Sequence, residues 1–150
     1  MAAQGKGTAS MITVTRLDLN DAHVMLKAAR AKADEIGVPM CIAITDDAGN
    51  LVAFERMDGG KVTSSTIAID KSFTASGAKK ATHEYGDASQ PGKPAYGIAS
   101  AIGGRLMVVG GGLPVMVNGQ CVGGIGVSSG TPAQDMEVAQ AGLDAVLATV

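Results

Sequence analysis

The apolar positions of the chain follow two spacings, one typical of helices and the other of strands. Helical spacing predicts helices over about 19–36 and 64–81, and a third from Met136 onward, each with one apolar face. Apolar runs bounded by turn residues predict strands at 40–45, 51–57, 106–110, 114–117 and 120–128. This order predicts an α/β (α+β) domain in which helices pack on one antiparallel sheet of four or five strands.

The last hairpin and the helix that follows it carry the clearest local patterns. Asn118-Gly119 predicts a two-residue turn, because both positions of such a turn need a positive φ. Thr131 is the expected N-cap of the last helix, with Pro132 at the first helical position and Gln134 placed to close a capping box. We therefore expect the strand at 120–128 to fold back along its neighbour and to lead directly into the last helix.

Two other segments depart from a regular pattern. The return strand contains Gly123, Gly124 and Gly126, where a missing side chain indicates a bulge or a backbone approached closely by a ligand or a packed helix. Residues 82–95 are polar and contain several Gly and Pro residues, so they predict a surface loop or lid.

Composition and charge restrict the class of protein and its partners. A chain of 150 residues, of which 46% are hydrophobic, is long enough for one domain with a substantial core. The net charge of -2 leaves no basic surface of the kind that nucleic acid requires. Every apolar run is far shorter than the roughly 20 residues of a membrane span. We expect a soluble protein with neither a nucleic-acid nor a membrane partner.

The first ten residues are polar and small, with no apolar stretch suited to a signal peptide. We expect residues 1–13 to be a flexible leader or a remnant of cloning, and residues 14–150 to form a single domain. Cys41 and Cys121 lie in predicted strands among apolar neighbours, which favours reduced core residues over a disulfide. These features together predict a cytoplasmic protein.

Several short motifs occur in order along the chain. They are Asp46-x-x-Gly49 followed by Leu51-Val52-Ala53-Phe54, then Arg56-Met57-Asp58-Gly59, Ile69-Asp70-Lys71-Ser72, Gly111-Gly112-Leu113-Pro114, Val117-Asn118-Gly119, Val122-Gly123-Gly124-Ile125-Gly126-Val127-Ser128 and Thr131-Pro132-x-x-Asp135. This series resembles the GlcG/HbpS family of haem-binding or haem-degrading-like domains over roughly residues 14–150. The resemblance implies a profilin-like three-layer domain that forms symmetric oligomers. Relatives are associated with haem binding and redox sensing, with glycolate-type operons, and with the C-terminal part of corrinoid adenosyltransferase-like proteins.

A haem iron held by an imidazole would have to use His23 or His83, the two histidines of the chain. The resemblance favours His23, since some family members have a haem-ligating histidine on the first helix. A partly buried structural role at the edge of the apolar stripe is the alternative for His23. His83 lies where the second predicted helix ends, a position suited to a helix C-terminus or to facing a pocket. No metal site is predicted beyond haem iron at His23.

Lys71 and Asp135 are the candidate catalytic residues if the protein is an enzyme. Lys71 falls in a helix of small and apolar residues, where a packed amine could bind a carboxylate or act as a base. The resemblance supports this position, because the family usually places a lysine there. The alternative is structural: the lysine extends to solvent or pairs with an acid such as Asp135, which the helix dipole alone favours in a first turn.

The glycine-rich segments predict an anionic ligand, because unpaired backbone N–H groups there could bind a propionate or a small carboxylate. The candidate residues are Gly111, Gly112, Gly123, Gly124 and Gly126. The positive groups nearest to the predicted openings are Arg56, Lys79, Lys80 and Arg105.

We therefore expect a small-molecule binding protein of the GlcG/HbpS type. Haem or another tetrapyrrole would lie between the glycine-rich hairpin, the middle helix and a neighbouring subunit of a homo-oligomer. One alternative is a cofactor-independent isomerase, lyase or hydrolase acting on a small organic acid, with residues 82–95 closing over the substrate. The other alternative is an oligomeric accessory scaffold.

Overall fold

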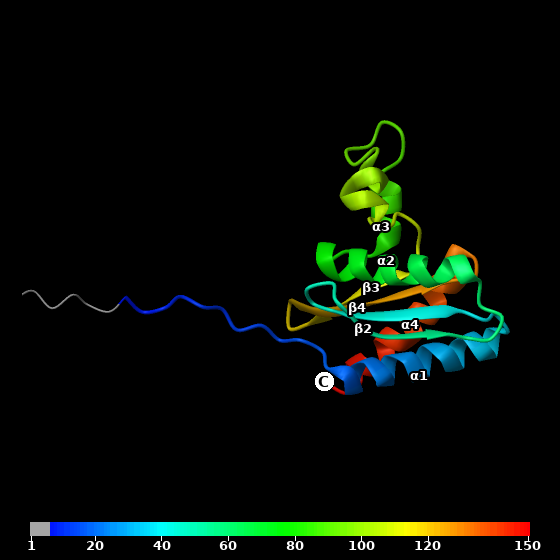
Figure 1. Ribbon diagram of the computed structural model, residues 1–150, viewed down its shortest axis with the longest axis horizontal. Helices are drawn as coiled ribbons and strands as arrows, with labels where there is room; N and C mark the ends of the chain where they lie inside the picture. The colour runs from blue at the N-terminus through cyan, green and yellow to red at the C-terminus, as the bar shows by residue number, and fades with distance from the viewer. Residues whose placement is uncertain (1–6) are drawn as a thin grey trace, which may run out of the picture.

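Four antiparallel strands form the centre of the computed structural model, which describes residues 7–150 (Figure 1). The strands are β1 (Cys41–Asp46), β2 (Leu51–Arg56), β3 (Gly112–Val117) and β4 (Gln120–Ser128). Their order across the sheet is β2-β1-β4-β3, and each neighbouring pair is antiparallel. The predicted fold class is confirmed, with the smaller of the two expected strand numbers.

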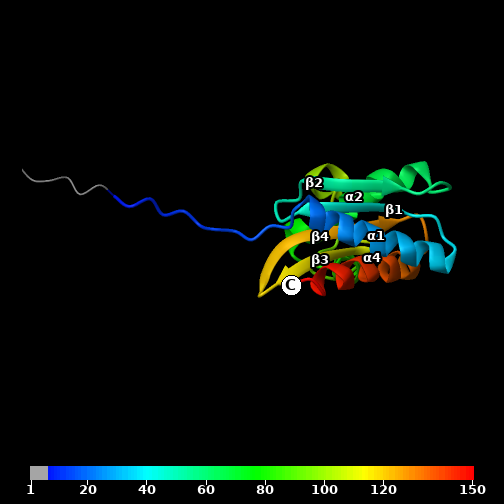
Figure 2. The same cartoon turned by 90° about the horizontal axis from the view of Figure 1, so that it is seen from below.

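Helices cover both faces of this sheet, so the domain has three layers (Figures 1 and 2). α1 (Leu19–Ile36) and α4 (Pro132–Leu147) lie side by side on one face, and α2 (Val62–Ala78) lies on the other. The larger hydrophobic core joins the sheet to α1 and α4, because buried apolar residues of these elements form one cluster. The predicted three-layer arrangement is confirmed.

The local patterns at the last hairpin and helix are confirmed as well. Asn118 and Gly119 have positive φ values of 49° and 77° in the turn between β3 and β4. Thr131 N donates to Gln134 Oε1 at 2.9 Å, and Gln134 N donates to Thr131 Oγ1 at 3.2 Å, which completes the capping box. Pro132 is the first residue of α4.

The prediction of a strand at 106–110 is wrong. The N–H of Met107 donates to Thr74 Oγ1 of α2 at 2.9 Å, so this part of the chain bonds to a helix side chain and not to a strand. The carbonyl oxygen of Val108 lies so close to Gly86 that a Cβ at Gly86 would collide with it. The apolar composition of the segment suits a strand, but tertiary contacts place it across the helices instead.

The prediction of an irregular loop over 82–95 is wrong in its first half. Thr82–Ala88 forms the short helix α3, and a 3-10 helix, η1, follows at Ile98–Gly104. The buried Thr82 hydroxyl attaches α3 to the sheet by accepting from Gly112 N at 2.9 Å. The segment 89–104, which includes η1, protrudes from the α2 side of the body (Figure 1).

The glycines of β4 allow α2 to approach the sheet closely. A Cβ at Gly124 would lie 2.9 Å from the carbonyl oxygen of Ser72, and a Cβ at Gly126 would collide with the backbone of Ala68 and Ser72. Ser72 Oγ also donates to Thr45 Oγ1 of β1 at 2.7 Å, which joins the two layers through buried hydroxyl groups. At these two glycines, the close neighbour is therefore the packed helix.

An extended arm precedes the first helix. Residues 1–6 of the predicted leader lie outside the described residues, and residues 7–16 contain neither helix nor strand. The arm joins the body at Leu17, whose N–H donates to Val122 O at 3.0 Å, and its other end points away from the sheet (Figure 1). Within residues 7–150, no helix is long and apolar enough to cross a membrane.

Candidate functional site

Lys71 and Asp135, which come from opposite layers of the domain, meet at one end of β4. Lys71 Nζ donates to Asp135 Oδ2 at 2.8 Å and to the carbonyl oxygen of Val127 at 2.9 Å. The other oxygen of Asp135 accepts from Gly130 N at 2.9 Å. The two side chains are only 1% and 3% exposed, so this is a buried ion pair in which Nζ and both carboxylate oxygens have hydrogen-bond partners.

Gly111 and Gly112 provide the space that this pair needs. Gly111 has φ 125°, and a Cβ there would lie 2.9 Å from Lys71 Nζ and 2.8 Å from Asp135 Cβ. A Cβ at Gly112 would lie 2.6 Å from the carbonyl oxygen of Lys71. The structure therefore brings four of the predicted site residues together, and it packs the two glycines against the ion pair.

Burial lowers the pKa of the Lys71 ammonium group, while the hydrogen bond from Lys71 to Asp135 opposes this shift. Neither Lys71 nor Asp135 lines any of the three cavities described below. A lowered lysine pKa suits a base, but a base must also reach the proton that it removes. In this conformation, the pair is enclosed and joins α2 to α4.

The two histidines lie on different layers of the molecule. His23 is an exposed residue of α1, and His83 is an exposed residue of α3 on the opposite side of the sheet. The structure therefore does not bring the two imidazoles to one site, and it does not place either of them beside Lys71. The partly buried position considered for His23 differs from the exposed one observed, because the apolar stripe of α1 passes through Ala22, Met25 and Leu26.

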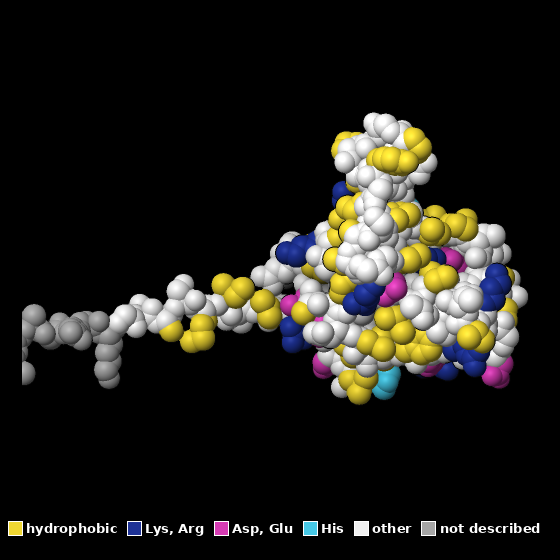
Figure 3. Space-filling model, turned by 45° about the horizontal axis from the view of Figure 1, so that its top comes forward, with side chains coloured by type: hydrophobic (Ala, Val, Ile, Leu, Met, Phe, Trp, Pro, Cys, Tyr) yellow, Lys and Arg dark blue, Asp and Glu magenta, His cyan; other side chains and the backbone are white. Residues whose placement is uncertain are grey.

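An aromatic cavity of about 300 Å³ lies on the outer side of α2. Its wall is formed by α2, α3, η1 and the segment after η1, through Phe73, Thr74, Gly77, Ala78, Tyr85, Ile102 and Leu106. Hydrophobic side chains surround the foot of the protruding segment (Figure 3). Two of the four aromatic residues of the chain, Phe73 and Tyr85, line this cavity.

Two cations stand against the aromatic rings of this cavity. The guanidinium carbon of Arg105 lies 3.7 Å from the centroid of the Phe73 ring, and Arg105 Nε donates to Asp70 Oδ1 at 3.0 Å. Lys80 Nζ lies 5.2 Å from the centroid of the Tyr85 ring. An apolar, aromatic cavity with cations at its rim can hold a flat ligand that carries carboxylates.

No sequence pattern assigned Phe73, Tyr85 or Ile102 to a site. Arg105 and Lys80 were among the positive groups expected near openings, and the structure places both beside the aromatic cavity. The one signal in the sequence was the scarcity of aromatic residues. Where a chain has so few, a place at which two of them gather is a candidate ligand site. Tyr85, Ile102 and Leu106 lie 12 to 33 positions after Phe73. They meet Phe73 only because their segments cross in the fold, which no local pattern predicts.

A second, larger cavity of about 620 Å³ lies where α1 ends beside β2. Arg30, Asp34, Glu55, Arg56 and Asp58 all contribute to its wall, so both signs of charge are present. The three acids of the wall outnumber its two arginines, and Arg30 is paired with Glu55 at 3.3 Å. The mixed charge makes this cavity a weaker candidate for an anion than the aromatic cavity.

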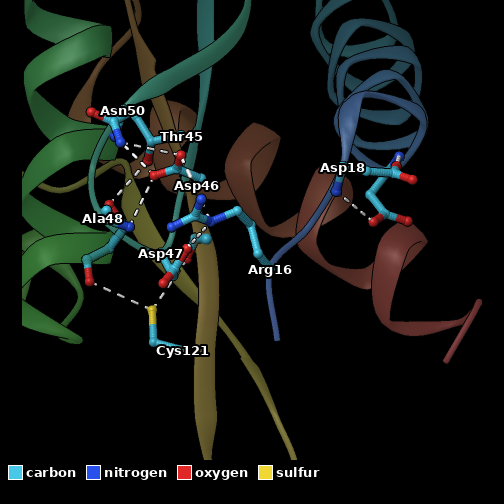
Figure 4. Close-up of polar contacts among 11 residues, drawn as sticks. Arg16, Asp18, Thr45, Asp46, Asp47, Ala48, Asn50 and Cys121 are labelled. Atoms are coloured by element: carbon cyan, nitrogen blue, oxygen red, sulfur yellow. Dashed lines mark hydrogen bonds and ion pairs between the residues drawn. The ribbon is translucent and has the colours of Figure 1, made fainter. Parts of the chain in front are cut away.

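The Asp46-x-x-Gly49 motif closes the turn between β1 and β2 (Figure 4). Asp46 Oδ1 accepts from Ala48 N at 2.9 Å and from Asn50 N at 3.0 Å. Arg16, at the root of the arm, donates to Asp47 and so attaches the arm to this turn. These contacts account for the motif by loop closure. Within residues 7–150, no group of three or more His, Cys, Asp or Glu side chains is placed to hold a metal ion.

Comparison with known proteins agrees with this architecture. The model of a family described as haem degrading protein HbpS-like matches residues 17–144. The chain belongs to the HbpS-like family. Among its relatives, an uncharacterized 15.0 kDa protein of Citrobacter freundii, from the dhaT-dhaS intergenic region, is 41% identical over 131 residues, which cover 87% of this chain and 92% of that protein. The recognised resemblance to the GlcG/HbpS family is confirmed.

A second relative is the corrinoid adenosyltransferase PduO of Salmonella typhimurium. It is 36% identical over 134 residues, which cover 89% of this HbpS-like chain but 40% of PduO. The chain therefore corresponds to less than half of that enzyme.

Solved structures share the same fold. The Klebsiella pneumoniae protein ORFY is 37% identical with a TM-score of 0.91, and the match covers 95% of this chain and 99% of ORFY. A PduOC–haem complex is 36% identical with a TM-score of 0.84, covering 87% of this chain and 95% of that chain. HbpS is 28% identical with a TM-score of 0.82, covering 96% of this chain and 97% of HbpS.

Proposed function

We propose that this HbpS-like domain is a small-molecule binding protein whose ligand is haem or another planar tetrapyrrole with carboxylate side chains. The aromatic cavity on the outer side of α2 is the observation that carries the proposal. Support also comes from PduOC, a relative crystallised as a haem complex. The proposal concerns residues 14–150 as one domain.

The residues around the cavity fit this class of ligand. Phe73, Tyr85 and Ile102 offer apolar cover for a flat ring system, while Arg105 and Lys80 stand where acidic side groups would need a partner. The volume of about 300 Å³ is at the lower end of the range of roughly 300–1,000 Å³ for ligand pockets. We therefore place one edge of the macrocycle in the cavity, with the protruding segment 89–104 beside it.

His83 is the better placed of the two candidate iron ligands for this cavity. It belongs to α3, the helix that supplies Tyr85 to the cavity wall, whereas His23 lies on α1 beyond the sheet. An axial imidazole would set the spin state and potential of a bound haem. The predicted cradle at Gly111, Gly112, Gly123, Gly124 and Gly126 receives less support, because those glycines pack against the ion pair, Leu17 and α2.

Binding is better supported than catalysis. The enzymatic alternative places proton transfer at Lys71 or Asp135, and that pair is enclosed away from the aromatic cavity. The proposal also includes assembly with copies of itself, a cytoplasmic location and no role for nucleic acid or membranes. The net charge of -2 supports the absence of a nucleic-acid partner, and two buried free cysteines suit a reducing compartment.

A haem titration followed by the Soret absorbance tests the site. Ile102 and Val62 are both exposed, but only Ile102 lines the cavity, so Ile102→Asp and Val62→Asp form a matched pair. We expect Ile102→Asp to raise the Kd for haem at least tenfold, while Val62→Asp leaves it within twofold. Equal effects of the two variants would contradict the proposed cavity.

Histidine variants separate the two candidate ligands in the same titration. We expect His83→Ala to shift the Soret maximum of the complex and His23→Ala to leave it unchanged. A Soret shift that depends on His23 and not on Ile102 would instead place the ligand on α1. No saturable change in the native protein would contradict haem as the ligand altogether.

A further inference from the structure

The arm exposes apolar side chains that the body of the same chain does not cover. Met11 and Ile12 are 84% and 89% exposed, and Val14 is also exposed. Figure 3 shows hydrophobic side chains along this arm, outside the body of the molecule. Three large apolar residues within four positions are more than the scattered apolar exposure of an ordinary surface, so this segment is suited to burial against a partner.

A small apolar groove opens at the root of the arm. Its aliphatic wall is formed by Val115, Val117, Val122, Val146, Leu147 and Val150, at the end of the body where β3, β4 and α4 meet. The groove has a volume of about 80 Å³. This space holds about five water-sized groups, which is comparable to one branched aliphatic side chain.

We propose that the arm of one copy of this chain docks its apolar side chains in this groove of a second copy. The exchange is reciprocal, because each copy carries both an arm and a groove, as a twofold symmetric interface requires. The proposal rests on the self-assembly included in the proposed function, and it is independent of the ligand. It assigns the arm as an interaction element.

The chain cannot easily place its own arm in its own groove. Thr15 and Arg16 are themselves part of the groove wall, so Val14 would have to reverse direction without any connecting residues. Residues 11–15, Met-Ile-Thr-Val-Thr, contain no Gly, Pro, Asn or Asp, and four of the five are β-branched. This composition favours an extended strand over a turn. Docking within one chain is therefore disfavoured.

The arm is long enough to reach a neighbour. Residues 7–16, fully extended, span about 30 Å, which is similar to the diameter of a domain of this size. Side chains of an extended segment alternate in direction, so Ile12 and Val14 point to one side, which is the more apolar, and Met11 and Thr13 point to the other. The apolar side of the arm is therefore the one that enters the groove.

Sedimentation equilibrium of the full chain over a range of concentrations tests this interface. Ile12→Asp places a charge on the apolar side of the arm, and Thr13→Asp places the same charge on the other side. We expect Ile12→Asp to raise the Kd of self-association at least tenfold, and Thr13→Asp to leave it within threefold. Both residues are exposed in the isolated chain, so neither substitution should affect folding.

Cysteine pairing identifies the partner of the arm. Ile12→Cys combined with Val150→Cys should form a disulfide between two chains under mild oxidation, seen as a dimer on a non-reducing gel, with the single variants as controls. A disulfide within one chain, or equal association of the two aspartate variants, would overturn arm exchange while leaving self-association intact. A monomer at every concentration would overturn both arm exchange and the assembly in the proposed function.

Discussion

Lys71 Nζ lies 2.8 Å from Asp135 Oδ2, although the two residues belong to helices on opposite faces of the sheet. The pair lies beside the end of β4, where Lys71 Nζ also donates to Val127 O. It therefore holds α2 and α4 to the same strand end. Removing one partner of a buried pair leaves a charge without compensation, which costs more than the intact pair contributes.

We predict that Lys71→Met lowers the free energy of unfolding by about 3–5 kcal/mol, because it leaves the Asp135 carboxylate buried and without its main partner. Urea denaturation measures this change. Lys27→Met is the control, since Lys27 is exposed on α1 and the same substitution there should change stability by less than about 0.5 kcal/mol.

The double variant Lys71→Met with Asp135→Asn tests whether the two residues act as one unit. Asparagine keeps an oxygen that can accept from Gly130 N, so the double variant should lose less stability than the sum of the two single losses. We expect a coupling energy of about 1–3 kcal/mol. Additive losses would show that the two side chains are energetically independent.

A pH dependence is expected at the root of the arm. A hydrogen bond from Arg16 holds the pKa of Asp47 below its usual range. Because the folded-state pKa is lower than the unfolded one, the stabilisation is complete above about pH 4 and is lost as the pH falls through the folded-state pKa. Arg16→Gln should therefore lower the Tm at pH 7 and converge with the native protein near pH 2.

Thermal melting at several pH values provides this measurement, with Lys27→Gln as a control for the loss of one positive surface charge. A difference between Arg16→Gln and the native protein that persists unchanged at low pH would assign the effect of Arg16 to packing and not to the Asp47 carboxylate.

Replacing Gly126 of β4 and Gly77 of α2 with alanine should change the free energy of unfolding in opposite directions. Gly126→Ala would drive a methyl group into the backbone of α2 and should cost about 1–3 kcal/mol or more. Gly77, within α2, has no atom within 4 Å of the position of a Cβ, so Gly77→Ala should stabilise the protein by about 0.5–1 kcal/mol. Denaturant midpoints of the two variants measure the contrast. Equal destabilisation would show that α2 lies differently over the sheet.

Neither cysteine should react in the native protein. Cys41 and Cys121 are buried and free, and burial raises the pKa of the Cys121 thiol. Ellman's reagent should therefore modify both thiols at least about a hundredfold more slowly in buffer than in denaturing urea. Rapid modification of a single thiol in buffer would reveal local opening of the strand that carries it.

Residues close together in the sequence allowed the correct prediction of several local features. The turn at Asn118-Gly119 and the capping box from Thr131 to Gln134 depend on groups within four positions of one another, so their geometry is present in the sequence itself. The strand predicted at 106–110 failed for the opposite reason. The N–H of Met107 donates to Thr74 in α2, a partner 33 positions away.

The candidate site shows the same division. Lys71 and Asp135 could be selected from the sequence. A lysine is unusual among small and apolar residues, and the helix dipole favours an acid in a first helical turn. That the pair lies enclosed is a tertiary outcome, and Gly111 leaves the room that the pair occupies. The aromatic cavity could not be predicted, because Phe73, Tyr85 and Ile102 meet only through the crossing of α2, α3 and η1.

The sequence by itself determined α1, α2 and α4, the two hairpins, the antiparallel sheet and the family, since periodicity, caps and turns act over a few residues and family motifs are read directly. It did not predict α3 or η1. Only the tertiary structure decided that Gly124 and Gly126 pack against α2, that the two histidines lie on separate layers, and that the aromatic cavity lies outside α2. These outcomes depend on distances between segments far apart in the chain, which hydrophobic burial and close packing set only when the whole domain folds.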